Sequence, residues 1–142
     1  MTGTLHDVGK IGVPDEILKK TGKLTDAEFA MVKLHPELGE RIVSQIPQLK
    51  ETLTGIRNHH ERWDGRGYPD GLAGEQIPIL ARILAVADTF DAMTSDRPYR
   101  PGMPIGRALD EIERGAGTQF DPEYAIRFVE LFREPGQQLE AA

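Results

Sequence analysis

The stretch "PILARILAVADTFDAM" (residues 78–93) decides the fold class, because it is apolar on almost every face. A helix of this character lies in the centre of a domain. The segments on both sides of it have helical periodicity, and no run of alternating apolar and polar residues marks a strand. We therefore expect one all-α domain, a helical bundle over residues 1–134, followed by a flexible tail over residues 135–142.

Start and stop signals divide the rest of the chain into further helices. Thr25 and Glu28 have capping-box spacing, which predicts that a helix begins there. Asp121, followed by proline, is the predicted N-cap of the last helix. Residues 64–78 are rich in glycine, so we expect a loop that contains a short hairpin. The predicted helices cover residues 14–20, 25–34, 36–46, 50–63, 78–93, 104–117 and 121–132.

The composition excludes several classes of protein. The chain of 142 residues has no cysteine, so any metal must bind to histidine and carboxylate, and thiol chemistry is excluded. No apolar run approaches the roughly 20 residues of a membrane span, and the N-terminus does not have the character of a signal peptide. The formal net charge of −6 argues against nucleic acid as the main partner. We expect a cytoplasmic protein.

Two residue types supply a set of candidate metal ligands. Neutral imidazole and carboxylate together suit hard or borderline divalent ions such as iron, manganese or zinc. Asp88 interrupts an apolar helix, where an uncompensated buried carboxylate would cost several kcal/mol. Its partner is either a metal ion or an arginine such as Arg82, unless Asp88 lies on an exposed stripe. The candidate ligands are all four histidines and two aspartates: His6, Asp7, His35, His59, His60 and Asp88.

Each histidine also has a purely structural interpretation. His35 can cap a helix, and His6 with Asp7 can form a capping pair. His59 and His60 point about 100° apart on a helix, so one of them can lie in the core and the other on the surface. Taken together these interpretations weaken, because all the histidines stand at helix ends or on buried stripes.

The spacing around Asp7 suggests the chemistry of such a site. Its carboxylate has two oxygens and can bridge two ions, while His6 binds one of them from the same turn. Two ions about 3.5–4 Å apart hold a hydroxide and clamp a phosphate oxygen. Lys10 lies one turn after His6 and can reach a phosphate as a point charge, although a lone lysine there is also typical of an exposed helix.

Four motifs in fixed order carry a resemblance to a known family. They are "HDVGK" (6–10), "HPELG" (35–39), "HHERWDGRGYP" (59–69) and "ADTFDAMTSDRPYR" (87–100). Together they resemble the HD-GYP subgroup of the HD metal-dependent phosphohydrolases, from about Leu5 to Phe132. A lone HD pair is weak evidence, whereas the four motifs in this order are specific.

The resemblance implies an all-helical enzyme, a phosphodiesterase that hydrolyses the bacterial second messenger cyclic di-GMP to pGpG, GMP or both. It implies a centre of two or three iron or manganese ions held by the six candidate ligands, with Asp7 bridging and a metal-bridging hydroxide as nucleophile. Asp7 and Lys10 would be the catalytic residues, and Lys10 would contact the scissile phosphate. Two alternatives stay open. One is a catalytically impaired module that binds cyclic di-GMP or a protein, and the other is an enzyme for another cyclic dinucleotide.

The resemblance also gives roles to the glycine-rich GYP loop. Gly65 and Gly67 would let the backbone turn sharply and pass close to a ligand. Asp64 would orient a metal-bound histidine by accepting its hydrogen bond. Tyr68 would offer its ring and hydroxyl to the substrate. Without the resemblance these residues read as ordinary turn and packing positions.

The remaining expectations concern a phosphate, partners and the N-terminus. Arg97 and Arg100 would bind the second, non-scissile phosphate of the substrate. A diguanylate cyclase or another signalling protein would contact the GYP loop, and the chain can form a homodimer. Family members usually have further helices before the HD motif, whereas only five residues precede His6. We therefore expect a truncated domain in which Leu5, Val8, Ile11 and parts of residues 78–93 are exposed.

Overall fold

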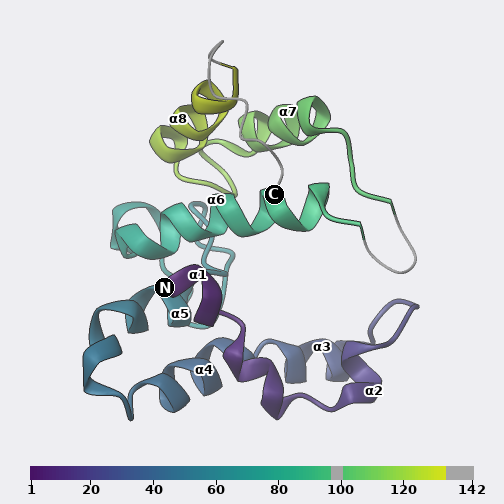
Figure 1. The fold of residues 1–142 in the computed structure, drawn as a ribbon, viewed down its shortest axis with the longest axis vertical. Helices are drawn as coiled ribbons and strands as arrows, with labels where there is room; N and C mark the ends of the chain where they lie inside the picture. The colour runs from purple at the N-terminus through teal and green to yellow at the C-terminus, as the bar shows by residue number, and fades with distance from the viewer. Residues whose placement is uncertain (97–100, 134–142) are drawn as a thin grey trace.

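A computed structural model describes residues 1–96 and 101–133, and within these ranges the chain is helical and has no strand (Figure 1). The predicted all-α class is confirmed. The predicted tail lies outside the described residues. None of the described helices has the length and apolar character that a membrane crossing requires. The elements are α1 (Thr2–Leu5), η1 (Val8–Gly12), α2 (Asp15–Leu18), α3 (Asp26–Val32), α4 (His35–Val43), η2 (Pro47–Thr52), α5 (Leu53–Asn58), η3 (Gly74–Gln76), α6 (Ile79–Thr94), α7 (Ile105–Gly115) and α8 (Pro122–Arg133).

Helix α6 lies across the middle of the molecule and separates two halves (Figure 1). The α7–α8 pair packs against one side of it, and α1 and α5 pack against the other, with α4 and η1 beyond them. The main apolar core lies between α6, α7 and α8, and further phenylalanine side chains of α6 and α8 pack against it. Its buried members are Val86, Leu109, Ile112, Phe120, Ala125 and Val129.

The central helix is buried on one face only. Ala81, Leu84 and Val86 are buried, whereas the apolar side chains of residues 79, 80 and 83 are between 42% and 54% exposed. Ile11 is 84% exposed. The predicted exposure of these segments is therefore confirmed. Leu5 and Val8, for which exposure was also expected, are half-buried.

Two helix starts follow from their caps. The side chain of Thr25 accepts a hydrogen bond from Glu28 N, and the Glu28 carboxylate accepts one from Thr25 N, so the predicted capping box is formed. Asp121 Oδ1 accepts from Glu123 N at 2.8 Å, which confirms the predicted cap of α8. In both cases the signal is local, because a side chain within three residues satisfies an otherwise free N–H.

The helix predicted over residues 50–63 is wrong at both ends. Residues before Leu53 form the 3₁₀ helix η2, and α5 ends at Asn58. The chain leaves the helix because Glu61 N donates to Asn58 O, which closes a tight turn. The buried Glu61 carboxylate then accepts from the backbone N–H groups of residues 70, 71 and 72 at 2.7, 3.0 and 3.0 Å. His59 and His60 therefore lie in a turn after the helix.

The hairpin expected in the GYP loop is not formed among residues 61–78. The loop contains only the short 3₁₀ helix η3, because side chains and a neighbouring segment take its backbone hydrogen bonds. Besides the contacts of Glu61, the N–H groups of Trp63 and Asp64 donate to the carbonyls of Gln119 and Thr118 at 3.2 and 2.9 Å. These two bonds attach the GYP loop to the turn between α7 and α8.

An ion-pair cluster holds the other end of this loop. The guanidinium of Arg57 donates to both oxygens of Asp70 at 2.8 Å and to Glu40 Oε2 at 2.7 Å. Asn58 Nδ2 also donates to Asp70 at 2.8 Å. Helices α4 and α5 thus position the end of the GYP loop together.

Candidate metal centre

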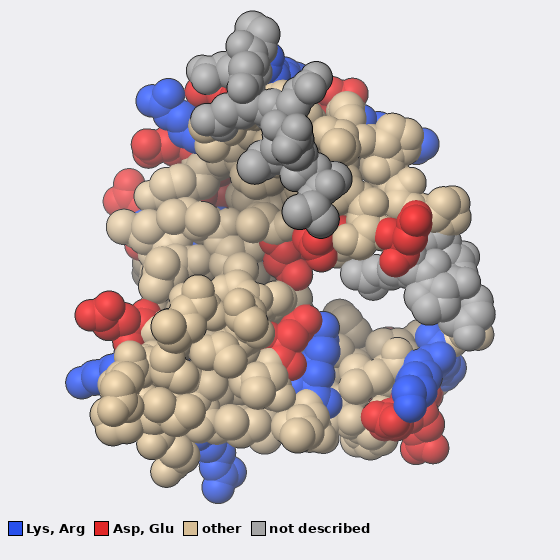
Figure 2. Space-filling model, viewed as in Figure 1, with Lys and Arg blue, Asp and Glu red and all other residues tan. Residues whose placement is uncertain are grey.

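The structure brings the six candidate ligands into one cluster. Asp7, His35, His59 and His60 each place one ligand atom within 4.8 Å of the others. His6 adjoins them, since its Nε2 lies 3.4 Å from Asp7 Oδ2 and 3.2 Å from Asp88 Oδ1. On the face seen in Figure 2, acidic and basic side chains meet at the edge of a hollow between the two halves.

Four separate segments supply these ligands. His6 and Asp7 lie in the turn between α1 and η1, His35 begins α4, the histidine pair follows α5, and Asp88 lies within α6. Gly9 lets the first segment approach the second. A Cβ at Gly9 would lie 1.9 Å from His35 O, so only a glycine allows η1 to pack this closely on α4. In this arrangement Asp7 Oδ1 lies 3.3 Å from His35 Nε2.

Three of the histidine rings are oriented by the same device. His6 Nδ1 lies 2.6 Å from Gly3 O, and His35 Nδ1 and His59 Nδ1 lie 2.7 Å from the carbonyl oxygens of residues 32 and 56. A carbonyl only accepts, so each Nδ1 carries the proton. Each Nε2 then carries a lone pair, which is the form in which imidazole binds a metal.

These lone pairs fit a bound cation. His35 Nε2 and His59 Nε2 are both acceptors and face each other at 3.4 Å. His6 Nε2 is buried without a hydrogen-bond partner among the described residues and faces carboxylate oxygens. Acceptors that converge without a donor are unfavourable, and a cation between them removes the conflict. The nitrogen and oxygen donors fit a divalent metal ion.

The electrostatics agree with this geometry. Burial lowers the pKa of His59 to about 4 and that of His60 to about 3, so both rings are neutral near pH 7. Burial raises the pKa of Asp7, but its two neighbours, His35 Nε2 at 3.3 Å and the ammonium of Lys10, outweigh burial and hold the pKa below its ordinary value. The Asp88 carboxylate, 3.2 Å from Nε2, raises the pKa of His6, because it would accept a hydrogen bond from the ring once Nε2 is protonated. A proton on His6 Nε2 thus offsets the same negative charge as a metal ion would.

The structure removes the main alternative for Asp88. Arg82, considered as its partner, instead pairs with Asp121 at 2.8 Å. Asp88 Oδ1 instead faces His6 Nε2 at 3.2 Å, and this neighbour lowers the pKa of the Asp88 carboxyl. Asp88 is half-buried and faces the histidine cluster.

Lys10 and Tyr68 lie at the rim of the cluster. Lys10 Nζ donates to Asp7 Oδ2 at 2.5 Å and is 40% exposed. The Tyr68 ring stacks on His60 with centroids 4.8 Å apart, and burial raises its pKa to about 12, so its hydroxyl stays protonated. Two residues that the sequence did not indicate adjoin it. Phe29 meets Tyr68 edge-on at 6.4 Å, and Lys33 Nζ lies 5.4 Å from the Tyr68 ring centroid.

The structure gives Asp64 partners other than a histidine. Its carboxylate accepts from Arg62 at 2.7 and 3.0 Å and from Arg66 N at 3.1 Å. Main-chain carbonyls, and not Asp64 as expected, orient the three histidine rings described above.

Two glycines of the GYP loop allow its backbone path. Gly65 has a φ of +76°, which favours glycine. A Cβ at Gly67 would lie 2.4 Å from Arg62 N, so this glycine allows a close approach to the protein's own backbone.

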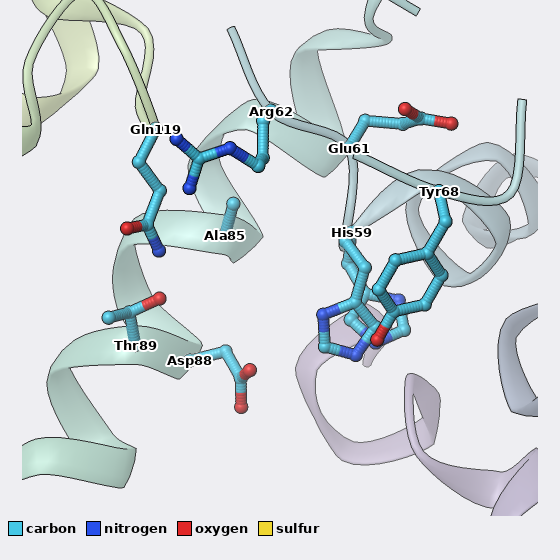
Figure 3. Close-up of a pocket in the computed structure, with 9 residues that line it drawn as sticks. His59, Glu61, Arg62, Tyr68, Ala85, Asp88, Thr89 and Gln119 are labelled. Atoms are coloured by element: carbon cyan, nitrogen blue, oxygen red, sulfur yellow. The ribbon is translucent and has the colours of Figure 1, made fainter. Parts of the chain in front are cut away.

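A pocket of about 170 Å³ adjoins the cluster. Its wall includes His59, His60, Tyr68 and Asp88, together with Arg62, Thr89 and Gln119, which the sequence did not indicate (Figure 3). Arg62 and Thr89 lie inside two of the quoted motifs and Gln119 lies outside them, so the sequence alone offers no reason to place these three residues together. The predicted phosphate-binding residues Arg97 and Arg100 lie outside the described residues.

Comparison with known proteins finds relatives over most of the chain. The family described as "HD domain" matches residues 1–124. A cyclic di-GMP phosphodiesterase of Thermotoga maritima is 48% identical over 132 residues, which are 92% of this chain and 36% of that protein. One of Pseudomonas aeruginosa is 48% identical over 91% of this chain and 31% of its own length. The 3'3'-cGAMP-specific phosphodiesterase 3 of Vibrio cholerae is 44% identical over 84% of this chain and 26% of its own.

A solved structure shows the same fold. The crystal structure of a cyclic GMP-AMP-specific phosphodiesterase of Vibrio cholerae superposes with a TM-score of 0.64 at 22% identity, over 94% of this chain and 37% of that one. The chain thus spans about a third of the length of the curated relatives it matches. Because the family match covers most of the chain and the motifs meet in one cluster, the chain belongs to the HD-domain family and carries the motifs of its HD-GYP subgroup.

Proposed function

We propose that this chain is a metal-dependent phosphodiesterase module that hydrolyses cyclic di-GMP to pGpG, GMP or both. One observation carries the proposal: imidazole lone pairs and a carboxylate converge within 4.8 Å, in the motif order of the HD-GYP subgroup. Relatives named cyclic di-GMP phosphodiesterases, at 42% to 48% identity, support the choice of substrate.

The proposed cofactor is a pair or triplet of iron or manganese ions. The donor set supports it, because imidazole nitrogen and carboxylate oxygen suit these ions, and the chain has no cysteine that would favour a softer metal. His35, His59 and His60 would hold the ions together with Asp7, and His6 and Asp88 would complete the set. When bound, such ions supply a nucleophile at neutral pH and stabilise charge on phosphoryl oxygens.

The protein's own residues would bind and orient the substrate. Lys10 donates to Asp7 Oδ2, and if Asp7 held a metal ion, the Lys10 ammonium would be available to a phosphate oxygen of the substrate. Tyr68, stacked on His60, would keep its protonated hydroxyl beside the reacting phosphate as a hydrogen-bond donor. Arg97 and Arg100 stay predictions as ligands of the second phosphate.

Turnover of cyclic di-GMP by the metal-loaded chain tests the proposal. The purified protein, loaded anaerobically with Fe²⁺ or with Mn²⁺, should form pGpG, measured by chromatography. Asp7→Ala should abolish product formation and lower the bound metal. Asp15→Ala is the matched control, since its carboxylate is 77% exposed and remote from the cluster, and it should retain full activity. A folded, metal-loaded wild type that hydrolyses no cyclic dinucleotide would refute the proposal.

A second candidate substrate is 3'3'-cGAMP. Three relatives from Vibrio cholerae, at 39% to 44% identity, are named as specific for it. This range overlaps the 42% to 48% identity of the relatives named cyclic di-GMP phosphodiesterases, so identity alone does not choose between the two substrates. Turnover of both cyclic dinucleotides, measured under the same conditions, would rank them.

The impaired binding module stays an alternative, which binding of cyclic di-GMP without product formation would support. The homodimer, the contact with a diguanylate cyclase and the cytoplasmic location remain predictions.

A further inference from the structure

We infer that the pocket between α6 and the turn before α8 is a subsite for one guanine base of the substrate. The inference rests on the proposed function and adds the determinant of base specificity. In Figure 3 the side chains of Arg62, Thr89 and Gln119 lie on one side of this pocket, and His59 and Tyr68 lie on the other.

The size of the pocket decides what it can hold. Its volume is about 170 Å³, and a cavity of roughly 150 Å³ takes one benzene molecule. It is therefore large enough for the edge of one aromatic base and too small for a whole cyclic dinucleotide. Because Asp88 and both histidines of the pair also line it, a base in this pocket lies next to the ligand cluster.

The pocket contains polar groups that no described residue satisfies. The Gln119 side chain and the Thr89 hydroxyl form no hydrogen bond within residues 1–96 and 101–133. Arg62 uses Nε and Nη2 to bind Asp64, which leaves Nη1 without such a partner in the same part of the chain. Half-buried donors in this state favour a polar ligand over an apolar one.

The chemistry of these groups favours guanine over adenine. Guanine presents two acceptors, O6 and N7, on one edge, and a guanidinium is the side-chain group that most often reads them. Arg62 and the amide NH₂ of Gln119 can both donate to that edge. Adenine would instead turn its N6 amino group towards Arg62, so that two donors would face each other. Cyclic di-GMP and 3'3'-cGAMP both carry a guanine, so one such subsite serves either substrate, whereas cyclic di-AMP has none.

Gln119→Ala is the cleanest probe of the subsite. The backbone of Gln119 holds the GYP loop through Trp63 N, whereas its side chain makes no hydrogen bond within the described residues, so the substitution leaves the loop attached. We expect kcat/KM for cyclic di-GMP to fall roughly 3- to 10-fold, the loss of one neutral hydrogen bond. Hydrolysis of bis(4-nitrophenyl) phosphate, a diester without a base, should be unchanged.

Gln119→Glu tests the reading of the base itself. A carboxylate only accepts, so it repels O6 and N7 of guanine and pairs with the N6 amino group of adenine. The ratio of kcat/KM for cyclic di-GMP to that for cyclic di-AMP should fall roughly 10-fold or more. Arg66→Met is the matched control. It changes the charge at an exposed position of the neighbouring GYP loop, outside the pocket wall, and should leave the ratio unchanged.

The outcomes separate this inference from the proposed function. If the ratio of kcat/KM for cyclic di-GMP to that for cyclic di-AMP is the same in the wild type and in both Gln119 variants, the guanine subsite is overturned, although cyclic di-GMP is still hydrolysed. An equal loss on the base-free diester would also overturn it, because the effect would then be structural. A wild type that hydrolyses only the base-free diester would instead refute the proposed function.

Discussion

Glu61→Gln should destabilise the protein although it keeps the shape of the side chain. The Glu61 carboxylate is 3% exposed and accepts three backbone hydrogen bonds, from Asp70 and Gly71 to Oε1 and from Leu72 to Oε2. A glutamine oxygen in the Oε1 position can keep the first two. Its NH₂ group would then face Leu72 N–H, so that two donors meet in a buried place.

The expected cost follows from the contacts that are lost. A hydrogen bond to a charged group contributes about 1.5–3 kcal/mol, and a buried donor left without a partner costs a similar amount. These two figures describe the same loss and are not added, so we expect Glu61→Gln to lower the free energy of unfolding by about 2–3 kcal/mol. Glu61→Ala loses all three bonds and should cost more.

Urea denaturation at pH 7 measures this effect. Trp63, the only tryptophan of the chain, lies in the GYP loop, so its fluorescence reports on the loop and circular dichroism reports on the helices. Glu75→Gln, at an exposed position of the same loop, is the control and should change stability by less than about 0.5 kcal/mol. Denaturation curves that coincide for Glu61→Gln and the wild type would refute the reasoning.

Three further predictions follow from the site and the loop. The metal-free protein should lose stability as the pH falls from about 6.5 towards 4, because the unfolded chain takes up protons that native His59 and His60 do not. The raised pKa of His6 offsets a part of this loss. Urea denaturation at several pH values measures the change, and a free energy of unfolding that does not vary with pH would contradict the prediction. Gly67→Ala should cost about 3 kcal/mol, because its Cβ would lie 2.4 Å from backbone atoms. Gly106→Ala, at an exposed position of α7 where a Cβ would meet no atom within 4 Å, should be neutral or slightly stabilising in the same assay. Metal at 100 times its dissociation constant should raise the free energy of unfolding by about 2.7 kcal/mol, and a chelator should reverse the shift in thermal denaturation.

The parts of the fold that local sequence determines could be predicted. The cap of α3 depends on Thr25 and Glu28, three positions apart, and both side chains make the expected bonds. The end of α5 could not be predicted in this way. It depends on the Glu61 carboxylate, which accepts hydrogen bonds from backbone N–H groups nine to eleven residues later. The spacing of apolar residues does not indicate such a contact.

The same distinction applies to the site. Histidine is rare in this chain and each of the four lies in the cluster, so the residue type alone indicated the ligands. Arg62 and Gln119 are ordinary residue types from distant segments. They line one pocket only because the GYP loop is attached to the turn before α8 by two backbone hydrogen bonds. A side chain of a common type gives no signal until the tertiary contact is known.

The way in which the histidine rings are held has a consequence for how such a site varies during evolution. His6, His35 and His59 each use the carbonyl of the residue three positions earlier, and these residues are Gly3, Val32 and Ile56. A main-chain carbonyl is present whatever the side chain. A mutation at these three positions therefore leaves the acceptor in place as long as the local turn survives. Substitutions at these neighbouring positions therefore leave the orientation of the histidine rings unchanged. A sequence motif for such a site can then consist of the ligand residues alone.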